Sequence, residues 1–231
     1  MERFQALLEV LLLSGLVSSL VAALLLQPLQ SGKAFDLLSN AWAFSLFLLL
    51  ESAIAFFLLF VIFRIRGERL SGLGLRWHRW KSHTVLGLGM VPVLLLMNGV
   101  IALAFRTYLP RYFLEENPLT GLVRTPGQLV LLIFSALIAG GIKEEVQRAF
   151  ILNRFRFYLG GTWTGLVVWS LAFGLGHYVQ GVQGVVIAVL YGFIFGLIYL
   201  RSGSLVAPIV AHGVYDSVAL VAFWFLSRSP R

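Results

Sequence analysis

Residues 139–156 read AGGIKEEVQRAFILNRFR, and this stretch decides the fold that we expect for the whole chain. Two adjacent glutamates, Glu144 and Glu145, lie inside an apolar run that is otherwise typical of a membrane helix. An ionised carboxylate in hydrocarbon costs about 2.5–3.5 kcal/mol even on the insertion scale that gives the lowest values. On a helix Arg148 follows one turn later, so it can neutralise one carboxylate and leave the other available. The stretch therefore predicts a functional acidic site inside the bilayer.

The composition of the chain excludes the water-soluble fold classes. Its 231 residues are 59% hydrophobic and only 12% charged, and the mean hydropathy is +0.89. Soluble domains carry about 25% charged residues, so we expect an all-α polytopic membrane protein. The chain has no cysteine, which excludes disulfides and thiolate metal sites.

The net charge of +8 is concentrated in residues 64–82, RIRGERLSGLGLRWHRWKS. Basic loops lie on the cytoplasmic side of membranes, so we expect this loop and the N-terminus to be cytoplasmic, in a bacterial inner membrane. Trp77 and Trp80 among these charges suit an interfacial belt on anionic lipid. The bilayer is therefore the expected partner of the positive charge, and nucleic acid is not.

Apolar runs predict about seven spans. Residues 1–127 form a three-helix membrane region, and residues 128–226 form a four-helix core with a polar cavity among helices four, five and seven. Glu9 lies near the start of the first span, where we expect the interface. Glu51 either belongs to the site or packs against a neighbouring helix or water, and we favour packing. The expected spans cover 4–26, 38–63, 84–105, 128 to about 156, 162–179, 184–200 and 205–226.

Helices four, five and seven each place ionisable side chains on one face within apolar sequence. Charged groups in lipid need protein or water partners, so we expect these side chains to meet in one polar cavity. A carboxylate beside an imidazole can deprotonate a water for attack on a carbonyl, and a second imidazole can steady the oxyanion. No Ser, Cys or Lys stands out as a nucleophile. The set comprises Glu144, Glu145, Arg148, His177, His212 and Asp216.

Besides the hydrolysis of a carbonyl substrate by activated water, three other functions fit the same residues. Two histidines and a glutamate can bind Zn²⁺ in a metalloprotease, although no His-Glu-x-x-His motif is present. The cluster can instead relay protons in a coupled transporter. A non-catalytic protein that binds peptides or membrane proteins is the remaining alternative.

Three motifs in order carry a family resemblance. Glu-Glu followed by Arg148, then Phe173-x-x-x-His177, then His212-x-x-x-Asp216 resembles the CPBP family of intramembrane proteases, which includes the CAAX prenyl endopeptidases and the bacteriocin-processing or Abi proteins. The resemblance covers about residues 128–226. It implies an endopeptidase without a metal cofactor that cuts membrane-embedded or lipid-anchored proteins or peptides.

The resemblance also implies roles for individual residues. Glu144 or Glu145 with His177 would activate water, and Arg148 would hold the glutamates. His212 and Asp216 would face the oxyanion, and Phe173 is assigned to substrate binding. We favour Glu144 as the base.

This chain departs from the family pattern at two positions. The usual spacing is Glu-Glu-x-x-x-Arg, one residue longer than here, so aligning Arg148 would place the first glutamate on Lys143. Asp216 replaces the usual Asn, and an ionised Asp cannot donate to an oxyanion, so it must be protonated or must orient His212. Counting about 1.5 Å per residue also places Glu144 toward the cytoplasm and His177 near the outer end of helix five. A tilted helix or a link that enters the membrane would reconcile the two depths.

Overall fold

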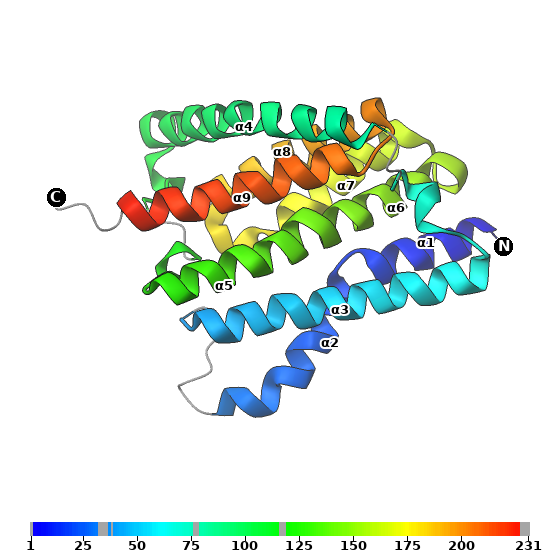
Figure 1. Cartoon of the computed structure of the whole chain (residues 1–231), viewed down its shortest axis with the longest axis horizontal. Helices are drawn as coiled ribbons and strands as arrows, with labels where there is room; N and C mark the ends of the chain where they lie inside the picture. The colour runs from blue at the N-terminus through cyan, green and yellow to red at the C-terminus, as the bar shows by residue number, and fades with distance from the viewer. Residues whose placement is uncertain (1, 32–36, 38, 76–78, 116–118, 227–231) are drawn as a thin grey trace.

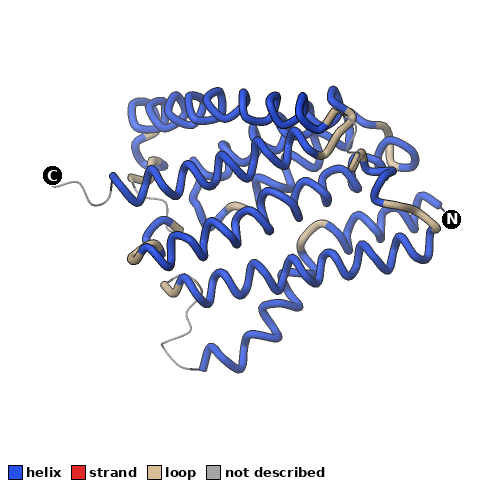
Figure 2. The backbone as a smooth tube through the Cα atoms, viewed as in Figure 1, coloured by secondary structure: helices blue, strands red, loops and turns tan. Residues whose placement is uncertain are grey.

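The computed structural model describes residues 2–31, 37, 39–75, 79–115 and 119–226. Within these ranges every element of regular structure is a helix, and the helices lie side by side in a bundle (Figures 1 and 2). The prediction of an all-α fold is confirmed. Trp77 lies outside the described residues, so the belt proposed for it stays a prediction.

Among the described residues, four helices are long and apolar enough to cross a membrane. A bent pair near the N-terminus makes a fifth span if it counts as one. The predicted count of seven is therefore not confirmed, because the other apolar helices are short or are divided by a change of helix type. The four are α3 (Ala41–Arg66), α4 (Trp80–Tyr108), α8 (Gly181–Ser202) and α9 (Val206–Leu226).

The first predicted span is broken. We expected one helix over 4–26, but α1 (Glu2–Leu13) and α2 (Leu16–Leu26) meet at an angle of 41°. Gly15 at the break has φ +93°, a left-handed conformation that only glycine adopts without strain. Ser14 and Gly15 interrupt the apolar run, and this pair is the local signal for the break.

The stretch 139–156 lies in the longest run of helix. This run comprises α5 (Pro126–Ala136), the π-helix η6 (Leu137–Glu144) and α6 (Glu145–Tyr158). Thr125 begins it with a capping box, because its side chain accepts from the backbone N–H of Gln128 while the Gln128 side chain accepts from the backbone N–H of Thr125. The joints keep right-handed helical dihedrals, so the axis continues alongside α3 and α9 (Figure 1).

The helix α7 (Thr162–Gly176) is shorter than the fifth span that we expected over 162–179. Its 15 residues span about 22 Å, less than the ~30 Å of a bilayer core, so it ends part-way along the bundle. The turn η7 (Tyr178–Gln180) then leads directly into α8. Gly192 and Gly196 of α8 face Ser170 and Leu166 of α7, and their lack of a side chain lets the two helices pack closely.

Buried ion pairs join the helices at the end of the bundle where α1, α3 and α6 meet. Glu9 accepts from Nε of Arg66 at 2.7 Å and from Nε of Arg154 at 2.6 Å. Arg154 also binds Glu68 at 3.0 Å. Two guanidinium partners hold the Glu9 carboxylate inside the protein, where the residue is only 5% exposed, and its interfacial depth stays a prediction.

The remaining elements are short turns in the connections. Leu205 donates its backbone N–H to the carbonyl of Gly74 at 3.2 Å, which ties the basic loop 64–82 to the start of α9. The side of the membrane on which this loop lies stays a prediction. The turns are η1 (Gln27–Ser31), η3 (Leu70–Leu73), η4 (Pro110–Tyr112) and η5 (Thr120–Leu122).

Candidate active site

Glycines in the π-helix let α9 approach the two glutamates. A Cβ on Gly141 would lie 3.2 Å from the Cα of Gly213, so the backbones of η6 and α9 pass in near contact. A Cβ on Gly140 would lie 2.6 Å from Oδ2 of Asp216 and 3.4 Å from Nε2 of His212. The absent side chains therefore leave room for the polar groups of α9 beside the glutamates.

Glu145 contacts its protein partners through Oε1, and its Oε2 is buried with no hydrogen-bond partner among the described residues. Its side chain is completely buried, forms an ion pair with Nη1 of Arg148 three residues later, and accepts from Nδ1 of His212 at 2.8 Å. The predicted role of Arg148 in holding a glutamate therefore has a direct counterpart in the geometry. Since Oε1 binds both a cation and an imidazole and the whole side chain is buried, Glu145 is poorly placed to take a proton from water.

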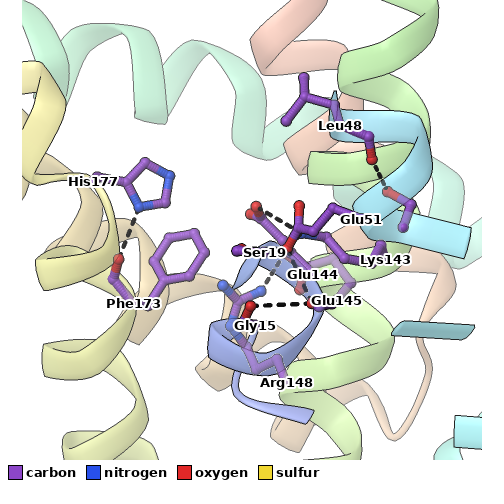
Figure 3. Close-up of polar contacts among 12 residues, drawn as sticks. Gly15, Ser19, Leu48, Glu51, Lys143, Glu144, Glu145, Arg148, Phe173 and His177 are labelled. Atoms are coloured by element: carbon purple, nitrogen blue, oxygen red, sulfur yellow. Dashed lines mark hydrogen bonds and ion pairs between the residues drawn. The ribbon is translucent and has the colours of Figure 1, made fainter. Parts of the chain in front are cut away.

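Glu144 is the more available carboxylate. Its side chain is 19% exposed, and its closest charged neighbours are Nζ of Lys143 at 3.7 Å and Nε2 of His212 at 3.9 Å. Both distances exceed direct hydrogen-bond range. The spacing differs from the family pattern, but a glutamate–arginine pair is still present. Glu145 pairs with Arg148, while the side chain of Lys143 pairs with Glu51 (Figure 3).

His212 and Asp216 lie one turn apart on α9. Oδ2 of Asp216 is 3.6 Å from Nε2 of His212, too far for a hydrogen bond. Nδ1 of His212 is held by Glu145, so the glutamate, and not Asp216, orients the ring. Nε2 therefore faces the carboxylates of Glu144 and Asp216.

Aromatic rings fill the space between the charged groups. The Phe173 ring lies 4.6 Å from the His177 ring and 4.9 Å from the Arg148 guanidinium, measured from ring centroids. Phe195 stacks on His212 at 4.6 Å and lies 5.5 Å from Arg148. Phe173 is only 8% exposed and contacts protein groups on several sides, so substrate binding by Phe173 stays a prediction.

His177 caps the end of α7 and has a defined tautomer. Its Nδ1 lies 2.8 Å from the backbone carbonyl oxygen of Phe173. A carbonyl oxygen can only accept, so Nδ1 carries the proton and Nε2 of the neutral ring keeps its lone pair. The Phe173 ring lies beside the His177 ring at 4.6 Å (Figure 3). The same ring lies 6.4 Å from His212, so one aromatic side chain neighbours both histidines.

Two residues beside the site were not among the predicted site residues. Lys143 is buried and binds both carboxylate oxygens of Glu51 at 3.0 Å. Glu51 also accepts from the hydroxyls of Ser18 and Ser19 on α2. The expectation that Glu51 packs against neighbouring helices is met, but its partner is the immediate neighbour of Glu144. The adjacent charge at Lys143 was the available signal.

In the part of the chain that the structure describes, no group of three or more His, Asp or Glu side chains is arranged to hold a metal ion.

The predicted site residues come from three segments of chain: the η6–α6 run, α7 and α9. Glu145 contacts Arg148 and His212 directly, whereas Glu144 and Asp216 lie 3.9 and 3.6 Å from Nε2 of His212. His177 joins this group through Phe173.

Residues 125–218 match the model of a known family, described as type II CAAX prenyl endopeptidase Rce1-like. This region belongs to the Rce1-like family. The resemblance inferred from the three motifs is confirmed for it. The Rce1-like region contains every predicted site residue and lies entirely after α4. No curated protein and no solved structure matches the chain. With the apolar helices described above, the Rce1-like family identifies an integral membrane protein.

Proposed function

We propose that this protein is a CPBP-type intramembrane endopeptidase in which Glu144 and His177 activate a water molecule. The observation that carries the proposal is the unequal commitment of the two glutamates. Glu145 has two direct partners and no exposure, whereas Glu144 is partly exposed and lies beyond hydrogen-bond range of its neighbours. A general base must have an accessible lone pair, and Glu144 keeps one.

In the proposed reaction a water lies between Glu144 and Nε2 of His177. Glu144 takes a proton from the water as the oxygen attacks the carbonyl carbon of the scissile peptide, and the amine leaves with a proton returned by the same carboxyl group. Nε2 of His177 accepts a hydrogen bond from the water, because its Nδ1 proton is held by the carbonyl of Phe173.

His212 would face the developing oxyanion. Its Nδ1 proton is donated to Glu145, so donation from Nε2 requires a ring that carries protons on both nitrogens. Asp216 lies on the Nε2 side and would either accept from this protonated ring or, when itself protonated, donate to the oxyanion. Glu145 and Arg148 would act by holding His212 in place.

The proposed substrate is a membrane-embedded or lipid-anchored protein or peptide, with a prenylated C-terminal CAAX-type peptide as the first candidate because of the family match. The purified protein would be reconstituted in liposomes and offered that peptide with and without its prenyl group. Wild-type protein should cleave it, and Glu144→Gln and His177→Ala should not. Glu115→Gln, an exposed loop glutamate, is the matched control and should retain the wild-type rate.

Equal cleavage by wild type, Glu144→Gln and His177→Ala would refute the proposed mechanism. Incubation with a chelator separates the zinc alternative: water activation by Glu144 predicts an unchanged rate, whereas loss of cleavage restored by Zn²⁺ would establish a metalloprotease. Substrate flux across sealed vesicles without a peptide product would instead support transport.

We also propose a bacterial inner-membrane location with the N-terminus and loop 64–82 cytoplasmic, on the strength of the positive charge in that loop. The chain contains no cysteine, so single cysteines can be introduced without background. A cysteine at Arg69 should react with an impermeant thiol reagent only after the cells are opened, and labelling of intact cells would reverse the topology.

A further inference from the structure

Lys143 places a buried positive charge next to the proposed base. Its side chain is 5% exposed, and its Nζ lies 3.7 Å from Oε1 of Glu144. The same nitrogen lies 3.0 Å from each carboxylate oxygen of Glu51 on α3 (Figure 3). Two carboxylates therefore compete for one ammonium group, and in this structure Glu51 binds it more closely.

Glu51 is itself held in place by the bent N-terminal pair of helices. Ser18 and Ser19 on α2 donate their hydroxyls to Oε1 of Glu51 at 3.3 and 3.2 Å. The break at Gly15 directs α2 across α3 and brings the backbone close to this oxygen, since a Cβ on Gly15 would lie 3.8 Å from it. The N-terminal helices therefore fix the position of a carboxylate beside the Rce1-like region.

The charges explain what this arrangement does for Glu144. In an interior of low dielectric, an unpaired ammonium group is strongly destabilised and moves to the nearest anion. Without Glu51 the nearest anion to Lys143 is Glu144, only 3.7 Å away. A direct ion pair would occupy the lone pairs with which Glu144 must accept a proton.

We propose that Glu51 is a positioning residue that holds Lys143 away from Glu144 and so keeps the base available. This inference rests on the proposed function, because it requires Glu144 to be the general base. It also gives α2 and α3, which lie outside the matched region, a part in the reaction.

The central test compares Glu51→Gln with Glu51→Gln/Lys143→Met. General base catalysis contributes about 10²–10⁴-fold, so partial capture of Glu144 should lower kcat by about 10- to 100-fold in Glu51→Gln, with KM unchanged. Removing the lysine as well frees Glu144, and kcat should return to near the wild-type value. A purely structural role would not produce this rescue, because the double variant lacks the ion pair too.

Two further variants separate an effect on Glu144 from a general loss of stability. Ser18→Ala/Ser19→Ala loosens Glu51 while leaving every charge paired, and it should lower kcat severalfold with rescue by Lys143→Met. Glu9→Gln is the matched control: it breaks a different buried ion pair and should lower thermal stability without changing kcat. Thermal unfolding of each protein is measured beside its kinetics.

The outcomes separate this inference from the proposed function. An inactive Glu144→Gln protein beside a fully active Glu51→Gln protein overturns this inference alone. A double variant as impaired as Glu51→Gln also overturns it, since the lysine would then not be the cause of the loss. A Glu144→Gln protein as active as wild type overturns both the base assignment and this inference.

Discussion

The two adjacent glutamates should respond differently to the same substitution. Glu145→Gln removes one partner of an ion pair in which the carboxylate and the guanidinium of Arg148 are both completely buried. Breaking such a pair costs about 3–5 kcal/mol. For a chain of this length about 1 kcal/mol lowers Tm by about 2–4 °C, so we expect Tm to fall by roughly 6–20 °C.

Glu144→Gln should leave the fold intact and remove the activity. Glu144 is 19% exposed and its nearest charged atoms are 3.7 and 3.9 Å away, so its ion pairs contribute about 1 kcal/mol or less and Tm should change by less than about 4 °C. Loss of the base should lower kcat by about 10²–10⁴-fold. Cleavage of the reconstituted protein and tryptophan-detected thermal unfolding measure the two effects on the same samples.

This contrast has a clear contradicting result. If Glu144→Gln lowered Tm as much as Glu145→Gln, the two carboxylates would be equally committed to structure. If Glu145→Gln alone abolished cleavage while remaining as stable as wild type, Glu145 would be the base, and the reasoning from burial and contact distance would be refuted.

Three further substitutions, the first with a matched control, test residues beside the site and one ion pair away from it. Gly140→Ala should lower kcat with a stability loss of about 1–3 kcal/mol, because its Cβ would meet Asp216, whereas Gly89→Ala, with open space around its Cβ, should leave kcat unchanged; kinetics and thermal unfolding on both proteins check this. Phe173→Leu removes the ring that contacts both site histidines and should lower kcat more than it raises KM in a steady-state assay. Glu9→Gln leaves two arginines without their shared carboxylate and should lower Tm by roughly 6–20 °C with kcat unchanged.

Local spacing accounts for most of what could be predicted about the site. Arg148 lies one turn from Glu145, and Asp216 lies one turn from His212, so each pair was visible in the sequence as a helix face. Their convergence followed from the high cost of leaving charges in lipid. These arguments use only the spacing of residues along a helix and the cost of desolvating charges, and both can be evaluated from the sequence.

Contacts between distant segments account for most of what could not be predicted. Glu51 and Lys143 are separated by 92 positions, and nothing in either local sequence specifies the other as its partner. The same holds for Glu9 and Arg154, whose pairing depends on how α1 packs against α6. The π-helix over 137–144 also could not be predicted from a periodicity of 3.6 residues, because an apolar run gives no signal for a wider helical turn.

The modest length of α7 has a consequence for the surrounding lipid. A segment of about 22 Å beside a hydrocarbon layer of ~30 Å is a hydrophobic mismatch, and lipid accommodates a short segment by thinning locally. The end of α7 carries His177, so the aqueous phase would come nearest to the middle of the bilayer beside that imidazole. Water would then cross a thinner layer of hydrocarbon to reach a scissile bond beside His177.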